Sequence, residues 1–403
     1  MPVPLLLAAA ILTDPGVKFA LAYLEANQDA HFARQIKISE IPAPTFDERL
    51  RGEFIASEFR RLGLQQIETD PRGNVLGWRP GKSPRAIAVA AHLDTVFPAG
   101  TNLKVRQQGK RYLGPGLGDD SNGLATQLAI IEALQHGKIA TNHTVLFVAN
   151  CCEEGLGDFQ GIKYLFNESP HRSRIDGFID IDGTNPDRIV NGALASKRYR
   201  VNITGPGGHS YGNFGRVSPM HALGRAMDYF ATANVPEKPK TTYNIGKIGG
   251  GTSINAIAAE AWMEVDMRSE SESELEKIEQ HLLASVRRGV DEENQLRAKS
   301  STKLAYETKL VGTKRAGFTP ESSPIVEAAK WAAGAMGLKP TLEISSTDSN
   351  VPINLGIPAI TLSGGGRGGS HHAPDEWYEP EGAWKGRQQI LLTILSYDEK
   401  AAK

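Results

Sequence analysis

The chain has 403 residues, more than one hydrophobic core usually serves, so two domains are expected. Its formal net charge is −1, so nothing in the charge favours nucleic acid or an anionic membrane as a partner. Its two cysteines, Cys151 and Cys152, are adjacent, which excludes a disulfide framework and a Cys-x-x-Cys metal knuckle.

The N-terminal residues leave localisation open. Leu5–Leu12 is an apolar run with the length of a signal-peptide core, too short to span a bilayer. It lacks the basic segment that precedes a secretory signal. It is therefore either a trimmed or atypical signal of a secreted or periplasmic protein, or a short packing segment of a cytoplasmic one.

Apolar runs alternate with helical patterns along most of the chain. Apolar residues at the helical period predict helices over Asp14–Gln35, Glu48–Leu62, Leu124–Gln135 and Pro324–Met336. Continuous apolar runs, typical of strands covered on both faces, occupy Ala86–Ala91, Thr144–Ala149, Gly177–Ile181 and Ala359–Leu362. This alternation predicts an α/β domain in which helices flank a mainly parallel sheet.

The middle of the chain has a different pattern. Ser196–Thr204 alternates polar and apolar residues, as in a sheet with one face in water. A β-α-β-β-α order follows from there to the amphipathic helix Glu272–Arg288. We therefore predict a two-layer α+β domain inserted at residues 194–308, which divides the larger domain into residues 1–193 and 309–403.

Acidic and histidine residues occur directly after the first of the apolar runs and within the first glycine-rich loop. Asp119 and Asp120 lie in residues 114–123, directly before a helix, where acids often serve only as caps. His92 and Asp94 follow the strand that ends at Ala91, where ligands of open α/β sheets gather. Because a metal-bound imidazole usually donates its other N–H to a carboxylate, Asp94 is expected to fix the ring of His92.

Two further strands end in acidic residues. Glu153 and Glu154 are consecutive and point in opposite directions from an extended segment, so one can ligate a metal while the other acts as a base. Alone, such a pair is more typical of a solvated turn. Asp182 lies nearer the carboxyl end of its strand than Asp180 and is the better ligand.

The last cluster, residues 364–376, offers a histidine from a glycine-rich loop. Either His371 or His372 can ligate a metal. A Gly-Arg-Gly-Gly fragment in this loop is also found in RNA-binding segments, but a single copy on a chain with almost no net charge does not support that function.

In this order, the motifs His-x-Asp, Gly-x-x-Asp-Asp, Glu-Glu-Gly and His-x-Pro-Asp-Glu resemble a known family. It comprises the co-catalytic dizinc exopeptidases and deacylases: peptidase T, carboxypeptidase G, acetylornithine deacetylase, succinyl-diaminopimelate desuccinylase and aminoacylase. The resemblance runs from His92 to Glu376 and includes the inserted domain. The Ile-Asp-Gly around Asp182 is most similar to peptidase T. Ser121 and Asn122 depart from the Lys and Gly or Ala often found there.

The resemblance implies two divalent metal ions, zinc first, with cobalt and manganese as alternatives suited to the same ligands. Asp119 would bridge the two ions. His92 and Asp182 would complete one site, and Glu154 and His372 the other, since His372 fills the His of His-x-Pro-Asp-Glu.

The resemblance also implies catalytic roles. Glu153 would be the general base for a hydroxide that bridges the metals, and Asp94 would be the partner of the histidine ligand. His209, in Gly-Gly-His-Ser, would reach the other subunit of a homodimer formed through the inserted domain and stabilise the oxyanion. Asn255 and Arg268 match positions that bind substrate carboxylate or carbonyl groups.

We therefore expect a metal-dependent hydrolase of the amide bond in small peptides. An N-acyl-amino-acid deacylase is the near alternative, and a non-catalytic, metal-stabilised binding module the remote one. Neither nucleic acid nor a membrane is expected as a partner. The sequence contains no Gly-x-Ser-x-Gly elbow and no Walker loop, so serine-esterase and P-loop chemistry have no support.

Overall fold

The computed structural model describes residues 5–297 and 300–401, which form two compact units. Unit 1 comprises Met1–Ala193 and Phe318–Lys403, and unit 2 comprises Leu194–Gly317. The chain returns to unit 1 later than the residue 309 expected from sequence. The reason is β14 (Ala305–Lys314), which continues the sheet of unit 2 by pairing along β9 (Ala195–Thr204).

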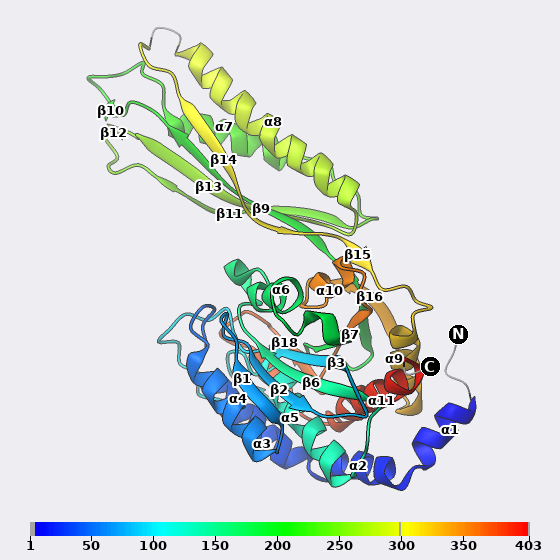
Figure 1. The fold of residues 1–403 in the computed structure, drawn as a ribbon. Helices are drawn as coiled ribbons and strands as arrows, with labels where there is room; N and C mark the ends of the chain where they lie inside the picture. Colours follow the sequence, from blue (N-terminus) through cyan, green and yellow to red (C-terminus); the bar gives the residue numbers. More distant parts are fainter. Residues whose placement is uncertain (1–4, 298–299, 402–403) are drawn as a thin grey trace. The chain divides into compact units, whose positions relative to one another are not determined.

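A nine-stranded sheet forms the centre of unit 1 (Figure 1). Its main path runs β1 (Gln65–Thr69), β2 (Val75–Arg79), β6 (His143–Asn150), β3 (Ser83–His92), β7 (Ile175–Ile181), β17 (Ala359–Leu362), β8 (Arg188–Ala193) and β15 (Gly317–Phe318), and β16 (Thr341–Ser345) pairs with β8. Strands β6, β3, β7 and β17 are mutually parallel. The predicted α/β class with a mainly parallel sheet is confirmed.

Helices cover both faces of this sheet, which explains the continuous apolar runs in the sequence. On β3, Ile87 and Val89 belong to a core shared with α2 (Pro15–Ala26), α4 (Arg49–Arg61), α5 (Ser121–His136), α9 (Pro324–Ala335) and α11 (Trp384–Ala401). The intervening Ala88 and Ala90 face a second core with α6 (Gln160–Asn167) and α10 (Asn350–Asn354).

Short elements complete unit 1. A four-stranded sheet has the order β18 (Arg367–Gly369), β19 (Trp377–Glu379), β5 (Arg111–Leu113) and β4 (Arg106–Gln108). Two 3-10 turns occupy Gly155–Gly157 and Arg172–Arg174. The single helix predicted over Asp14–Gln35 is wrong, because Asn27, with φ −103° and ψ 19°, separates α2 from α3 (Gln28–Ser39).

The apolar N-terminal run forms α1 (Leu5–Thr13). Among the described residues no single helix has the length and apolar character needed to cross a bilayer. One bent pair, Leu6–Thr13 with Pro15–Ala26, meets the criteria of length and composition with a bend of 64°.

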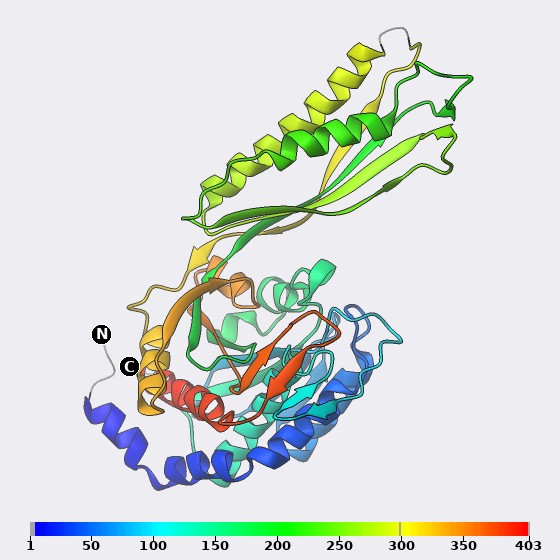
Figure 2. The ribbon, with the colours of Figure 1, turned by 180° about the vertical axis from the view of Figure 1, so that it is seen from behind.

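Unit 2 has two layers (Figure 2). The strands β11 (Thr241–Gly250), β13 (Glu260–Ser269), β9 and β14 form an antiparallel sheet in that order. Helices α7 (Pro219–Ala231) and α8 (Glu272–Leu296) pack on one face, against alternate residues such as Met263 and Val265. The other face is polar, as the alternating pattern predicts. A separate ribbon pairs β10 (Gly208–His209) with β12 (Ala256–Ile257).

A buried carboxylate, Glu132 on α5, ties three helices of unit 1 together. It accepts hydrogen bonds from Arg34 (2.6 Å) and Arg61 (3.0 Å) and lies 3.5 Å from His31. Burial alone would raise the pKa of Glu132, but its contacts with His31, Arg34 and Arg61 outweigh burial and lower the pKa to about 2. The ionised form therefore stabilises the fold.

Replacing Glu132 by Gln should lower the free energy of unfolding at pH 7 by about 3 kcal/mol, since the pKa falls from about 4.3 in the unfolded chain to about 2. A carboxylate whose pKa is lowered by folding stabilises the folded state at pH values above its unfolded pKa. The difference in unfolding free energy between wild type and variant should therefore shrink as the pH falls below about 4.5. Urea unfolding between pH 7 and pH 3.5 measures it. The exposed pair partner Glu53 is the control, because Glu53→Gln should cost under about 1 kcal/mol. A difference independent of pH would contradict the assignment.

Candidate metal centre

Asp119 lies at the centre of the acidic and histidine residues of unit 1. Its Oδ1 is 3.0 Å from Nε2 of His92, and its Oδ2 is 3.1 Å from Nε2 of His372. The same nitrogen of His372 is 3.0 Å from Oε1 of Glu154. Ligand atoms of His92, Asp119 and Asp182 lie within 4.8 Å of one another, and so do those of Asp119, Glu154 and His372. These two groups of residues match the two sets of ligands that the family resemblance implies.

The sheet explains why these residues meet. His92 ends β3, Glu154 follows β6, and Asp182 follows β7. Because these three strands are parallel neighbours, their carboxyl ends lie at one edge of the sheet. Asp119 comes from the loop before α5, and His372, whose φ is +66°, comes from the loop between β18 and β19.

The donor set fits divalent cations. Carboxylate oxygens and imidazole nitrogens are the ligands of two-metal hydrolase sites, and each group of three holds one histidine and two carboxylates. A third group, His92 with Glu153 and Glu154, overlaps them. His92 and Glu154 are buried, whereas the side chain of His372 is 53% exposed. The site is therefore open to solvent at His372.

The electrostatics also favour cations. Asp119 and Glu154 raise the pKa of His372 to about 11. Burial opposes the charge on His92, yet Asp119 and Asp94 raise its pKa well above the usual value. Burial, Asp119 and Glu154 raise the pKa of Asp182 to about 6. The carboxylates hold protons on both imidazoles, and bound metal ions would replace those protons.

Asp94 does more than the sequence suggested. Nδ1 of His92 contacts the main-chain carbonyl of Asp94 at 3.0 Å, while the carboxylate is 3.5 Å away. The carboxylate instead accepts the backbone N–H groups of Glu153 and Glu154, each at 2.9 Å, and the hydroxyl of Thr45 at 3.0 Å. One residue therefore orients both the histidine and the consecutive glutamates.

Glu376, for which the sequence predicted no role, anchors the glycine-rich loop at residues 114–123. It is fully buried, and its carboxylate accepts the N–H groups of Gly116 (2.8 Å), Gly118 (2.7 Å) and Asp119 (3.1 Å). The signal for this role was its place at the end of His-x-Pro-Asp-Glu. Asp120 is a second anchor, since it accepts N–H bonds from Gly123 (2.9 Å) and His92 (3.2 Å).

His209 and Asn255 belong to unit 2, where the β10–β12 ribbon places them side by side. The N–H of Ser210 donates to the carbonyl of Asn255 at 2.9 Å. Nδ1 of the exposed His209 accepts the N–H groups of Tyr211 (3.3 Å) and Gly212 (3.2 Å), which leaves Nε2 as the nitrogen that can donate a proton.

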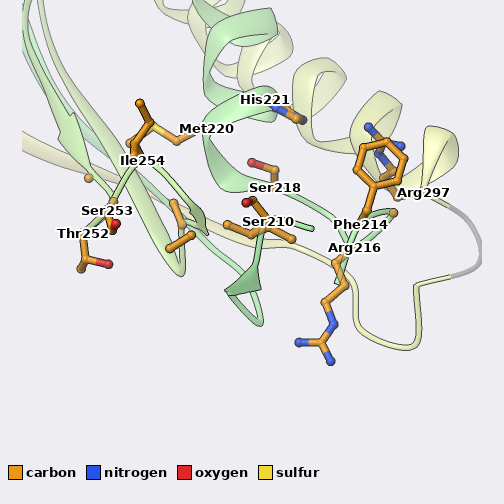
Figure 3. Close-up of a pocket in the computed structure, with 16 residues that line it drawn as sticks. Ser210, Phe214, Arg216, Ser218, Met220, His221, Thr252, Ser253, Ile254 and Arg297 are labelled. Atoms are coloured by element: carbon orange, nitrogen blue, oxygen red, sulfur yellow. The ribbon is translucent and has the colours of Figure 1, made fainter. Parts of the chain in front are cut away.

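A cavity of about 630 Å³ adjoins this ribbon (Figure 3). Its lining includes Ser210 and Arg216 from one loop and Thr252, Ser253 and Ile254 from the other. Pockets of this size hold small-molecule ligands.

The other predicted substrate-binding residue, Arg268, lies elsewhere in unit 2. It is next to the last residue of β13, whereas Asn255 precedes the first residue of that strand. Its Nε donates to Asp266 at 2.7 Å, and Asp266 also accepts a bond from Arg198 at 2.9 Å. Within unit 2, Arg268 is therefore separate from the loops of His209 and Asn255.

The model of the Peptidase family M20/M25/M40 matches residues 88–396, which include every proposed metal ligand. The chain belongs to this family. Among M20 relatives, carboxypeptidase G2 of Pseudomonas sp. (strain RS-16) is 26% identical over 231 residues, which cover 54% of each protein. The chain thus spans about half the length of that curated relative.

Solved structures show the M20 fold over nearly the whole chain. Aminopeptidase PepT from Bacillus cereus has a TM-score of 0.71 and 21% identity, over 93% of this chain and 99% of that one. The YXEP protein of Bacillus subtilis, described as a dinuclear metal-binding peptidase of the M20 family, has a TM-score of 0.65 and 16% identity, over 92% and 98%.

Substituting Glu376 by Gln in this M20 protein should weaken metal binding by about 10- to 100-fold, because an amide cannot accept all three N–H groups that position Asp119 and its loop. Metal titration with a competing chelator measures the affinity. Glu381→Gln is the matched control, since the side chain of Glu381 is 81% exposed. Equal affinities in wild type and both variants would exclude this anchoring role.

Proposed function

We propose that the protein is a metal-dependent hydrolase that cleaves the amide bond of small peptides. The observation that carries the proposal is the sharing of Asp119 between two groups of ligands, His92 with Asp182 and Glu154 with His372. Two divalent ions, zinc first, would be held there. When bound, they supply Lewis-acid polarisation of the carbonyl and lower the pKa of water.

Glu153 is the proposed general base. Its backbone is fixed by the carboxylate of Asp94, and its side chain can approach within 4.8 Å of ligand atoms of His92 and Glu154. From there it can accept a proton from the attacking water and deliver it to the leaving nitrogen. Its position beside, rather than within, the two shared-ligand groups supports a base over a ligand.

His209 and Asn255 are the proposed substrate contacts of unit 2. The proton on Nε2 of His209 suits it to donate a hydrogen bond to the developing oxyanion. Asn255 lies beside it, and the adjoining cavity of about 630 Å³ is large enough for a short peptide. Since Nε of Arg268 donates to Asp266, a substrate carboxylate would bind the terminal nitrogens of its guanidinium group.

A homodimer formed through unit 2 is part of the proposal, with His209 acting on the partner's substrate. The loops beside His209 expose large apolar side chains: Tyr211 is 90% exposed, Phe214 81% and Ile254 104%. Apolar groups gathered in this way are typical of contact surfaces.

A panel of substrates tests the function. Di- and tripeptides, N-acetyl amino acids and N-succinyl amino acids should be incubated with metal-loaded protein, with and without chelator. We expect cleavage of peptides with a free N-terminus, abolished by chelator and restored by metal. Turnover of acylated amino acids alone would assign a deacylase with the same residues. No turnover with two metals bound would favour a binding module.

Replacing Glu153 by Ala should lower kcat by about 10²- to 10⁴-fold while the protein retains both metals, because the base is lost and the ligands are not. Kinetics and metal analysis of the same sample measure both. Glu168→Ala, at an exposed position, is the control and should retain full activity. A Glu153→Ala variant as active as wild type would remove this residue from the mechanism.

The dimer proposal predicts complementation. Glu153→Ala and His209→Ala homodimers should both be nearly inactive. A mixed dimer has one site with an intact base and an intact partner histidine, so mixing should restore part of the activity. Failure to recover activity in purified mixed dimers would show that His209 does not act across subunits.

A further inference from the structure

Arg387 is a buried cation whose charge is not matched by any described carboxylate within hydrogen-bond distance. It lies in the first turn of α11 and has no exposed surface. Its Nε donates to the hydroxyl of Thr126 at 3.4 Å. Its two terminal nitrogens, Nη1 and Nη2, have no hydrogen-bond partner among the described residues. A guanidinium has five donors, so most of this one is unsatisfied.

The described titratable groups close to Arg387 supply no negative charge that would balance its guanidinium. Arg34 is close enough to contribute to the lowered pKa of Arg387, after the larger effect of burial. Burial raises the pKa of the nearby Tyr378 to about 12, which keeps that phenol neutral. The first turn of α11 carries the positive end of the helix dipole. The carboxylate of Glu132 is already engaged by Arg34 and Arg61.

Arg51 shows how the same unit buries an arginine when protein groups serve it. Arg51 is also fully buried, but its Nη1 donates to the carbonyl of Leu93 at 2.7 Å. Its Nη2 and Nε donate to the carbonyl of Ile41 at 2.8 and 3.2 Å. Each of the three side-chain nitrogens of Arg51 therefore has a carbonyl acceptor, whereas Nη1 and Nη2 of Arg387 have none among the described residues. A buried charge without partners is strongly unfavourable, so a counterion is required.

We propose that Arg387 holds a small monovalent inorganic anion, chloride under ordinary conditions, in the interior of unit 1. One positive charge calls for one negative charge. Full burial of Arg387 and its neighbours Thr126 and Tyr378 excludes a large or organic ligand.

The site adjoins residues 364–365, which belong to the same loop region as His372. The hydroxyl of Thr126, which accepts the bond from Arg387, also contacts the carbonyl of Gly364 at 3.4 Å. Asn122, one turn earlier on α5, donates to the carbonyl of Gly365 at 3.1 Å. A bound anion would therefore join α5, α11 and residues 364–365 from the inside. This inference is independent of the proposed hydrolase activity.

Bromide tests the proposal on the unmodified protein. Crystals of the metal-loaded protein grown in sodium bromide should give an anomalous peak next to Nη1 and Nη2 of Arg387. A peak at the metal centre alone, or only a water molecule at Arg387, would overturn the proposal.

Thermal unfolding provides the second test. At constant ionic strength, the midpoint should rise by several degrees as chloride, bromide or nitrate replaces gluconate. The rise should be absent in Arg387→Met and retained in Arg106→Met, a control at an exposed arginine. Equal anion responses in wild type and Arg387→Met would contradict the proposal. If Arg387→Met does not fold, the wild-type protein decides alone, and a midpoint that does not respond to these anions would overturn the proposal.

Discussion

The centre of unit 1 depends on one carboxylate placed between two imidazoles. Asp119 contacts His92 with one oxygen and His372 with the other, and further acids surround this trio. Such a concentration of negative charge among largely buried side chains is unfavourable unless cations balance it. The loop that carries Asp119 is fixed by two carboxylates, Glu376 and Asp120, which accept hydrogen bonds from its backbone N–H groups. Metal binding and folding are therefore expected to be coupled in this protein.

Two residues beyond the ligands give the centre its order. Asp94 joins the end of β3 to the residues after β6, so that the same carboxylate positions the proposed base Glu153 and the proposed metal ligand Glu154. Glu376 joins residues far apart in the sequence, since it lies more than 250 positions from Gly118. Both act through backbone N–H groups, which fixes the position of a loop more firmly than a contact to a mobile side chain would.

The parallel sheet and the residues at its carboxyl edge could be predicted from the sequence, because short local patterns of apolar and acidic residues mark them. His92, Glu154 and Asp182 follow continuous apolar runs, and parallel strands bring such positions together. The strand β1 was missed because its residues are mostly exposed and polar. The hydrogen bonds of Asp94 to the glutamate backbone, and the unmatched charge of Arg387, depend on tertiary packing that no sequence pattern reports. The roles of His209, Asn255 and Arg268 still rest on the family resemblance and the geometry of unit 2.

The strand order has a consequence for synthesis of the protein on the ribosome. Unit 2 is continuous in sequence and can fold as soon as it emerges. Unit 1 cannot, because β17 lies between β7 and β8, which are made long before it. Until residues 359–362 appear, the edges of β7 and β8 lack their partner, and exposed strand edges attract other chains. The interval in which unit 2 is translated is thus the period when the nascent chain most needs protection by chaperones.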